Sequence, residues 1–207
     1  ADELIGVPVV GPSREAARLE ASKAFAKEVM AEGRVPTAAA VVTHSLTEGE
    51  RYLAQYGEHR CPVVLKADGL AAGKGVIVTD SLQSARESLP LVWEVPGTTR
   101  VLIEERLIGS EVSLIAACNG TEAVLLPPAH DFKRIFEQDE GPNTGGMGTV
   151  APSPRCSEEE ATRLMGEVIT PVLRAMRERG TPFKGFLYAG LMKLSDGSFR
   201  VLEYNVR

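Results

Sequence analysis

The central part of the chain reads VVLKADGLAAGKGVIV from Val63 to Val78, a glycine-rich segment between two runs of β-branched residues. Such runs favour strands, so the pattern predicts a strand, a loop and a second strand. Glycines let backbone N–H groups converge on an anion, and a lysine in the loop adds a mobile positive charge. We therefore expect the loop Asp68–Gly75 to hold phosphates. Its candidate contacts are Gly69, Gly73, Lys74 and Gly75.

This loop is not a Walker P-loop. A P-loop requires the pattern Gly-x-x-x-x-Gly-Lys-Ser/Thr followed by a helix. Here the spacing is one residue short, Gly75 follows Lys74, and a β-branched run comes next. A glycine-rich hairpin between two strands instead suits a flap that closes over a triphosphate. The alternative interpretation is a flexible turn with a solvated lysine, because glycine-rich turns are common.

Two lysines at inward-facing positions favour the phosphate site. Lys66 shares a strand face with Val64, where an apolar residue is expected. Lys23 lies between Leu19 and Met30 in the apolar stripe of a helix predicted over 13–32. A lysine directed inward needs an anionic partner or a route to water, and snorkelling is the alternative explanation for Lys23. Two such lysines near one glycine-rich loop predict a shared phosphate site.

The rest of the chain alternates predicted helices with antiparallel hairpins and lacks regular βαβ units, which predicts an α+β fold. Helices are expected over 47–56, 81–89 and 157–179, the last beginning with a capping box of Ser157 and Glu160. Asn119-Gly120 is a strong hairpin signal. Strands are expected over 41–42, 62–67, 76–79, 101–105, 111–118, 122–126, 186–193 and 199–204, and a long irregular loop over 127–154.

The composition bounds the class of protein. With 43% hydrophobic and 25% charged residues, the chain reads as a soluble globular protein. A net charge of −5 argues against nucleic acid or anionic membrane as the main partner. No apolar run is long enough for a membrane helix. Cys61, Cys118 and Cys156 show no metal spacing and indicate reduced thiols, so a cytoplasmic location is expected.

Four sequence blocks spread over nearly the whole chain form one ordered pattern: Lys66–Val76, Gly141–Gly148, Gly185–Met192 and Glu203–Arg207. Together they resemble the ATP-grasp superfamily, and within it the ligases that join glycine to 5-phosphoribosylamine in purine biosynthesis. The resemblance implies an α+β fold of two lobes whose antiparallel sheets clasp ATP.

The resemblance also implies a domain organisation in three parts. Residues 1–36 would be a strand and helix that continue from a missing N-terminal domain. Residues 37–103 would form a small lid lobe. Residues 104–207 would form a large lobe with the metal and substrate loops, followed by a missing C-terminal domain.

Roles in nucleotide binding follow from the same resemblance. Lys23 and Lys66 would contact the ATP phosphates, and the loop around Lys74 would close over them. The segment containing Glu104, Glu105 and Leu107 would present backbone groups to adenine, with a solvated strand end as the alternative. Glu111 would hold the ribose hydroxyls.

Glu203 and Asn205 are the expected metal ligands for Mg²⁺, with Mn²⁺ as an alternative. Alternation along the last strand would place them on one face with Phe199 and Val201, and hard oxygens directed inward at this spacing suit Mg²⁺. A surface glutamate and a turn-forming asparagine are the alternative. Other grasp enzymes carry a further carboxylate about a dozen residues earlier, where this chain has Leu191-Met192.

The acceptor substrates would lie along two segments. Their expected contacts are Asp131, Lys133, Arg134, Asn143, Thr144, Gly145 and Gly146. An arginine can bind a phosphate bidentately, and a lysine binds it as a point charge. The chain departs from the superfamily pattern at His130 and Phe132, where Gln and His are usual.

The implied reaction is a two-step ligation. Glycine would attack the γ-phosphate of ATP to form glycyl phosphate, and 5-phosphoribosylamine would then displace phosphate. Such chemistry asks mainly for positioning and charge neutralisation, so Arg207 and Lys66 are the candidate catalytic residues. Two alternatives stay open: a nucleotide-binding module without ligase activity, and an ATP-grasp ligase with another acceptor.

Overall fold

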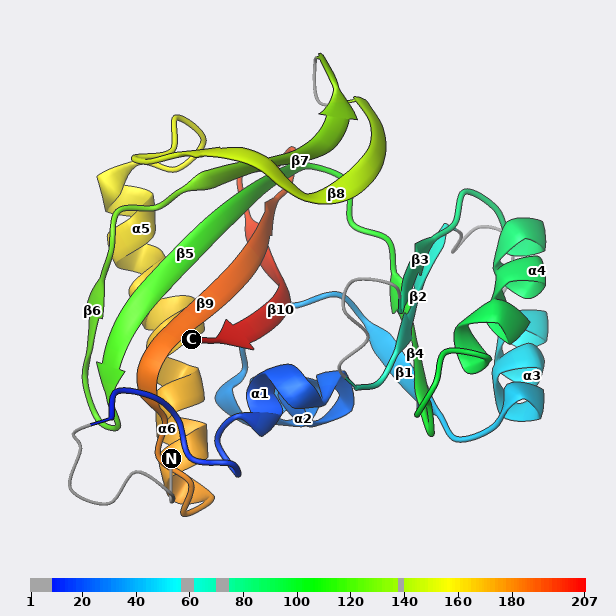
Figure 1. The fold of residues 1–207 in the computed structure, drawn as a ribbon, viewed down its shortest axis with the longest axis horizontal. Helices are drawn as coiled ribbons and strands as arrows, with labels where there is room; N and C mark the ends of the chain where they lie inside the picture. Colours follow the sequence, from blue (N-terminus) through cyan, green and yellow to red (C-terminus); the bar gives the residue numbers. More distant parts are fainter. Residues whose placement is uncertain (1–8, 57–61, 70–74, 138–139) are drawn as a thin grey trace. The chain divides into compact units, whose positions relative to one another are not determined.

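The computed structural model describes residues 9–56, 62–69, 75–137 and 140–207, which divide into two compact units (Figure 1). The small unit comprises Glu20–Phe25 and Ala38–Leu107. The large unit comprises Ala1–Leu19, Ala26–Thr37 and Ile108–Arg207. The boundary expected between residues 103 and 104 falls inside a strand that continues to Glu105.

The small unit is a four-stranded antiparallel sheet covered by two helices on one face. Its strand order is β1 (Ala40–Thr43), β4 (Val101–Glu105), β2 (Val63–Ala67) and β3 (Val76–Val78). The covering helices are α3 (Leu46–Tyr56) and α4 (Leu82–Trp93). Alternate residues of β2 and β4, such as Leu65 and Ile103, form the core beneath these helices together with Leu53 and Leu89. The opposite sheet face carries the remaining residues of each strand.

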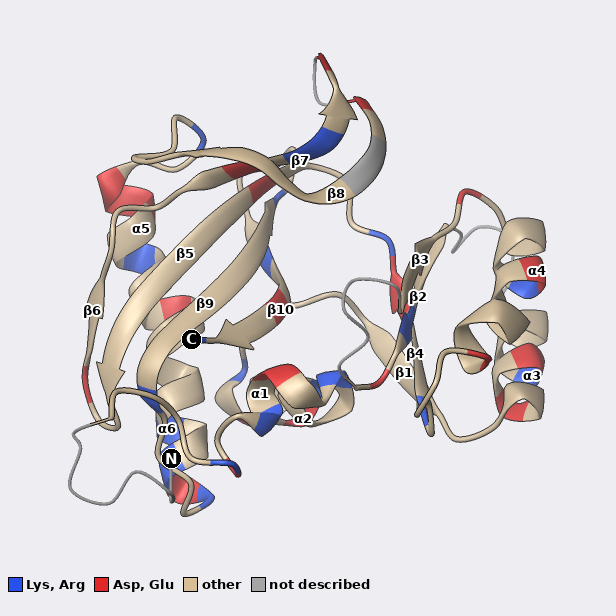
Figure 2. Cartoon of the chain, in the orientation of Figure 1, with Lys and Arg blue, Asp and Glu red and all other residues tan. Residues whose placement is uncertain are grey.

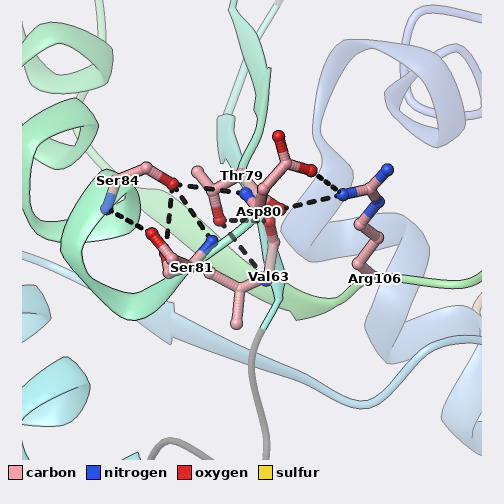
Figure 3. A network of polar contacts seen from close by, with 6 residues as sticks. All are labelled: Val63, Thr79, Asp80, Ser81, Ser84 and Arg106. Atoms are coloured by element: carbon pink, nitrogen blue, oxygen red, sulfur yellow. Dashed lines mark hydrogen bonds and ion pairs between the residues drawn. The ribbon is translucent and has the colours of Figure 1, made fainter.

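A polar network joins the start of α4 to the end of β4 (Figure 3). Ser81 and Ser84 form a capping box at the N-terminus of α4. The Thr79 hydroxyl donates to the Val63 carbonyl at 2.8 Å. Arg106 forms an ion pair with Asp80 and donates to the Thr79 carbonyl at 3.2 Å. The segment after β4 is therefore fixed to the neighbouring helix.

The large unit contains a four-stranded antiparallel sheet and a two-stranded sheet. The first has the order β10 (Phe199–Val206), β9 (Lys184–Lys193), β5 (Ser110–Asn119) and β6 (Ala123–Leu125). The second pairs β7 (His130–Phe136) with β8 (Glu140–Val150). A continuous helical run of α5 (Glu158–Leu164), η3 (Met165–Ile169) and α6 (Thr170–Glu178) lies along one face of the larger sheet (Figure 1).

Charge is distributed over both units, with acidic and basic residues interspersed on helices and strands (Figure 2). None of the described helices is both long and apolar enough to cross a membrane.

Two secondary-structure predictions are wrong. The helix expected over 13–32 is two helices, α1 (Arg18–Ala21) and α2 (Lys23–Gly33), because the Ser22 hydroxyl accepts a hydrogen bond from the Phe25 N–H and caps a new helix. The loop expected over 127–154 contains β7 and β8. Glycine-rich β8 has no period-two pattern, and its pairing with β7 stabilises it.

The helix predicted over 157–179 is confirmed, including its capping box. It contains the π-helical segment η3, which ends two residues before Pro171, and the missing N–H of this proline removes one helical hydrogen bond. The hairpin predicted at Asn119-Gly120 is also confirmed, and Gly120 adopts φ +105°.

Tyr204 fixes β10 to this helical run. Its side chain is 2% exposed, and its hydroxyl donates to the Val168 carbonyl at 2.8 Å. We expect Tyr204→Phe to lower the free energy of unfolding by about 1 kcal/mol, because the core volume is kept and one buried hydrogen bond is lost. Urea denaturation measures this change. An unchanged denaturation midpoint would show that water or another donor replaces the hydroxyl.

Cys118 makes stability depend on pH above neutrality. Burial raises the pKa of its thiol from 9.0 to about 11. The stabilising contribution is therefore complete below about pH 9, where both folded and unfolded thiols are protonated, and is lost as the pH rises toward 11. We expect the free energy of unfolding to fall less between pH 9 and 11 in Cys118→Ala than in the unaltered chain. Equal falls in both would contradict this origin.

Candidate functional site

Lys66 is buried in the small unit, and its partner is a carboxylate. It shares a face of β2 with Val64 as predicted, but this is the face opposite the helices, since Val63 and Leu65 form the core. This face is also buried beside Lys66, because its cross-strand neighbour Leu102 is 0% exposed. Lys66 itself is only 8% exposed, and its ammonium lies 2.7 Å from the Glu104 carboxylate. The anionic partner that an inward lysine needs is present within the sheet.

The segment predicted to face adenine begins with this same glutamate. Glu104 is 3% exposed, so the alternative of a solvated strand end is wrong for it, whereas Glu105 is exposed. The Glu105 N–H donates to the Ala39 carbonyl at 2.9 Å, and the Arg106 N–H donates to the Pro62 carbonyl at 3.2 Å. Backbone pairing on both sides of β4 therefore holds this segment in place up to the half-buried Leu107.

Lys23 contacts the beginning of the glycine-rich loop. It is the first residue of α2, and its ammonium donates to the Gly69 carbonyl at 2.9 Å. Gly69 has φ +120°, a conformation that side chains disfavour. The Ala67 N–H donates to the Gly75 carbonyl at 2.7 Å and closes the hairpin. Gly73 and Lys74 lie outside the described residues. Lys23, Gly69 and Lys66 all belong to the small unit.

A β-bulge in β10 places the two predicted metal ligands. Val201 pairs with Leu191 and Glu203 pairs with Gly190, so the register shifts by one residue at Leu202. Glu203 and Asn205 consequently lie on the sheet face opposite Phe199 and Val201, and the prediction of one shared face is wrong. Tyr204 takes the inward direction instead. The bulge turns both polar side chains away from the helix-packed core.

The side chains of Glu203 and Asn205 lie side by side. The Asn205 amide donates to the Glu203 carboxylate at 3.2 Å. Gly190 keeps the space beside them open, because a Cβ there would lie 3.3 Å from the Tyr188 ring and 3.6 Å from Glu203 Cγ. Within the described residues no three His, Cys, Asp or Glu side chains form a metal-binding group. Two protein oxygens suit Mg²⁺, which commonly completes its shell with water and phosphate.

Lys133 of β7 belongs to the same cluster of the large unit. Its ammonium lies 3.4 Å from the Glu111 carboxylate. Burial alone would lower the pKa of Lys133, but electrostatic interactions with Tyr188, Glu111 and Glu203 outweigh it and the pKa is raised. The ammonium is therefore positive at neutral pH. It can neutralise either these carboxylates or a bound phosphate.

The two predicted substrate segments are joined as one two-stranded sheet. Backbone pairing aligns Arg134 with Asn143, of which the backbone alone is described. The Thr144 hydroxyl donates to the Lys133 carbonyl at 2.8 Å and accepts from the Gly146 N–H at 3.1 Å. Further members are Asp131, whose carboxylate would lie 3.1 Å from a Cβ at Gly146, and Gly145, where an added Cβ would have no neighbouring atom within 4 Å.

His130 contacts the backbone of Glu111 and is buried. The imidazole is 2% exposed, and its Nδ1 lies 3.1 Å from the Glu111 carbonyl. Its ring meets the edge of Phe132 at 4.3 Å between centroids. Nε2 is buried without a hydrogen-bond partner among the described residues. A general base would need access to a proton donor, so this geometry favours a structural role.

Arg207 is exposed at the end of β10. Its backbone pairs with Phe186, with N···O distances of 2.9 and 3.0 Å. Its guanidinium donates to the Val206 carbonyl at 2.9 Å. Strand pairing thus fixes the backbone of the candidate catalytic arginine.

Residues 21–207 match the family described as phosphoribosylglycinamide synthetase, ATP-grasp (A) domain. The chain belongs to this family. Among curated relatives, the phosphoribosylamine–glycine ligase of Streptomyces coelicolor is 50% identical over 202 residues, which are 98% of this chain and 46% of that protein. The ligase of the same name from Vibrio vulnificus strain YJ016 is 46% identical over 98% of this chain and 47% of that protein. The chain therefore spans about half the length of these relatives.

Solved structures give the same ATP-grasp fold. The crystal structure of phosphoribosylamine–glycine ligase from Thermotoga maritima matches with a TM-score of 0.86 and 37% identity, over 99% of this chain and 52% of that one. D-alanyl-alanine synthetase A of Vibrio cholerae matches with a TM-score of 0.71 at 14% identity, over 98% of this chain and 60% of that one, and shows the fold alone. The predicted α+β ATP-grasp fold is confirmed.

Two residues that lie beside Gly190 in the candidate site were not predicted from the sequence. The Ser113 and Tyr188 hydroxyls lie 3.1 Å apart beside Gly190. Strand alternation could have placed Tyr188 on the face of Gly190, because both lie in the strand predicted over 186–193. The distance between the two hydroxyls depends on the pairing of β5 with β9, which the sequence did not reveal.

Proposed function

We propose that the chain is the ATP-binding core of a ligase that joins glycine to 5-phosphoribosylamine. The products would be glycinamide ribonucleotide, ADP and phosphate. The family match over residues 21–207 carries this proposal, and relatives bearing the ligase name are 46–50% identical. The buried lysine and the lysine–loop contact of the small unit supply the chemistry that a triphosphate requires.

In the small unit, Lys23 and Lys66 would neutralise the ATP phosphates. Both ammonium groups already contact oxygen atoms, of the Gly69 carbonyl and the Glu104 carboxylate respectively. A phosphate would exchange for or extend these contacts, with the loop through Lys74 and Gly75 closing over it. The backbone from Glu104 through Glu105 to Leu107 would receive adenine.

In the large unit, Glu111 would hold the ribose hydroxyls, and Glu203 and Asn205 would hold Mg²⁺, or Mn²⁺ in its place. The bound ion would supply charge neutralisation to the phosphates. The amide–carboxylate hydrogen bond between Asn205 and Glu203 orients both side chains before the ion arrives. Lys133, which lies beside Glu111, would contribute a further positive charge.

The reaction would proceed in two displacements. A carboxylate oxygen of glycine attacks the γ-phosphorus, its bond to ADP breaks, and glycyl phosphate forms. The amine nitrogen of phosphoribosylamine then attacks the acyl carbon, phosphate leaves with the bonding electrons, and the nitrogen loses a proton. Lys66 and Arg207 would stabilise the transferring phosphoryl group. The acceptor would lie along β7 and β8, with contacts to Asp131, Lys133, Arg134, Asn143, Thr144, Gly145 and Gly146.

Two other functions are distinguishable from this one. The chain alone would be a nucleotide-binding module if the substrate sites need further domains of a longer enzyme. The observation that favours this function is that the chain spans about half the length of its relatives. Alternatively, another amine would be the acceptor. We propose a cytoplasmic location, as expected for biosynthesis with small soluble substrates.

A two-part measurement tests the function. Calorimetry with ATP and Mg²⁺ measures nucleotide binding, and release of ADP with glycine and phosphoribosylamine measures ligation. Binding with ADP release supports the full proposal, whereas binding without release leaves the nucleotide-binding module. Failure of both this chain and a longer version with flanking domains to bind ATP would refute it. ADP release with a different amine alone would reassign the acceptor.

A further inference from the structure

Asp68, the first residue of the glycine-rich loop, is buried and has several partners. Its carboxylate is 2.5 Å from the Arg100 guanidinium and 3.2 Å from the Ser22 hydroxyl. It also accepts a hydrogen bond from the Ala24 N–H at 3.2 Å. The Asp68 N–H in turn donates to the Arg100 carbonyl at 2.9 Å. Both the backbone and the side chain of Asp68 are therefore held.

These contacts connect the loop to the start of α2. Ala24 is the second residue of this 11-residue helix, whose first N–H groups have no partner within the helix. The Asp68 carboxylate satisfies one of them, and the Ser22 hydroxyl satisfies that of Phe25. A negative charge at this position also interacts favourably with the helix dipole. A residue 44 positions away thus completes the helix cap.

Lys23 lies within this connection. Its neighbours Ser22 and Ala24 both bind the Asp68 carboxylate, and its own ammonium donates to the carbonyl of Gly69, the residue that follows Asp68. Two consecutive loop residues are thereby bound to three consecutive residues around the helix start. The relative position of Lys23 and the start of the loop is fixed by three hydrogen bonds.

We propose that Asp68 is a positioning residue for the nucleotide phosphates, which acts by clamping the start of the glycine-rich loop to Lys23. This inference rests on the proposed nucleotide-binding function and deepens it. The carboxylate is not expected to touch the nucleotide, because its oxygens are already engaged by Arg100, Ser22 and Ala24. Arg100 neutralises its charge, so that it does not repel a phosphate.

The test compares ATP with adenosine as ligands, because only ATP uses the phosphate-binding loop. We expect Asp68→Ala to weaken Mg·ATP binding at least about tenfold while adenosine affinity stays within about twofold. Arg100→Ala should produce the same selective loss, and Arg100→Lys, which keeps the charge, should recover most of it. Glu87→Gln, an exposed change on α4 of the same unit, is the matched control.

Affinities are measured at a temperature where denaturation curves show every variant to be fully folded. A parallel loss for ATP and adenosine would show a merely structural role and overturn the proposal, as would unchanged ATP affinity in Asp68→Ala. If Asp68→Ala does not fold, Ser22→Ala and Arg100→Ala give the same comparison. Absence of ATP binding by both the unaltered chain and a longer version with flanking domains would refute the proposed function itself, and this inference with it.

Discussion

Replacing Lys66 with alanine is expected to weaken Mg·ATP binding by about 10- to 150-fold. The loss corresponds to one charged hydrogen bond to a phosphate, about 1.5–3 kcal/mol. The same change removes an ion-pair partner of Glu104, whose carboxylate is 3% exposed. Removing one member of a buried ion pair typically costs about 3–5 kcal/mol, so the free energy of unfolding should fall as well. Calorimetry measures the first effect and urea denaturation the second.

A double variant separates the two effects. Lys66→Met with Glu104→Gln removes both charges and should recover much of the lost stability, because neither member of the buried ion pair keeps its charge. Its ATP affinity should remain as low as that of Lys66→Ala. Lys184→Ala, a change at an exposed lysine on β9, controls for the general loss of positive charge. Recovery of ATP affinity in the double variant would remove Lys66 from the phosphate site.

Replacing Glu203 with alanine should raise the Mg²⁺ concentration that nucleotide binding requires. Residues that only support a metal ligand already change metal affinity by about 10–100-fold when mutated, so loss of a coordinating carboxylate should cost at least about tenfold. The measurement is ATP affinity over a titration of Mg²⁺. In the unaltered chain affinity should rise with Mg²⁺, and in Glu203→Ala the rise should need a concentration at least about tenfold higher.

Neighbouring variants sharpen this result. Asn205→Asp keeps an oxygen at the second ligand position and should keep the response to Mg²⁺, whereas Asn205→Ala should weaken it. Glu122→Ala, an exposed change in the same unit, should behave as the unaltered chain. If Glu203→Ala responds to Mg²⁺ at the original concentration, the ion is bound elsewhere, and the assignment of Glu203 and Asn205 fails.

The sequence was informative wherever local chemistry determines local structure. The hairpin around the glycine-rich loop, the Asn119-Gly120 turn and the Ser157 capping box each depend on residues a few positions apart, and all three are present. The resemblance that gave the ATP-grasp fold also rests on contiguous blocks. Features encoded by neighbouring residues were thus predictable.

Features that depend on distant partners were not predictable. The cap that Asp68 adds to α2 joins residues 44 positions apart. The β7–β8 sheet forms although glycine-rich β8 has little intrinsic strand preference. In both cases tertiary contacts outweigh local propensity, which a linear pattern does not contain.

For the candidate site, the sequence predicted which residues are candidates, but not which groups they contact or which sheet face they lie on. Lys66 was expected to need an anion, but that the Glu104 carboxylate supplies one within the sheet follows only from the pairing of β2 with β4. The reversed face of Glu203 and Asn205 follows from one extra residue in β10. The position of one residue in a strand cannot reveal such an insertion, because either register satisfies the polar and apolar pattern over a short segment.

The β10 bulge gives this strand one residue more than its partner strand needs. Leu202 is that residue, because Val201 pairs with Leu191 and Glu203 pairs with Gly190. Deleting Leu202 would therefore restore simple alternation, with Tyr204 still directed into the core and Glu203 and Asn205 still directed away from it. Deleting a residue from the partner strand β9 at this point would instead lengthen the mismatch. The strand can thus lose one residue here without exchanging its inner and outer faces.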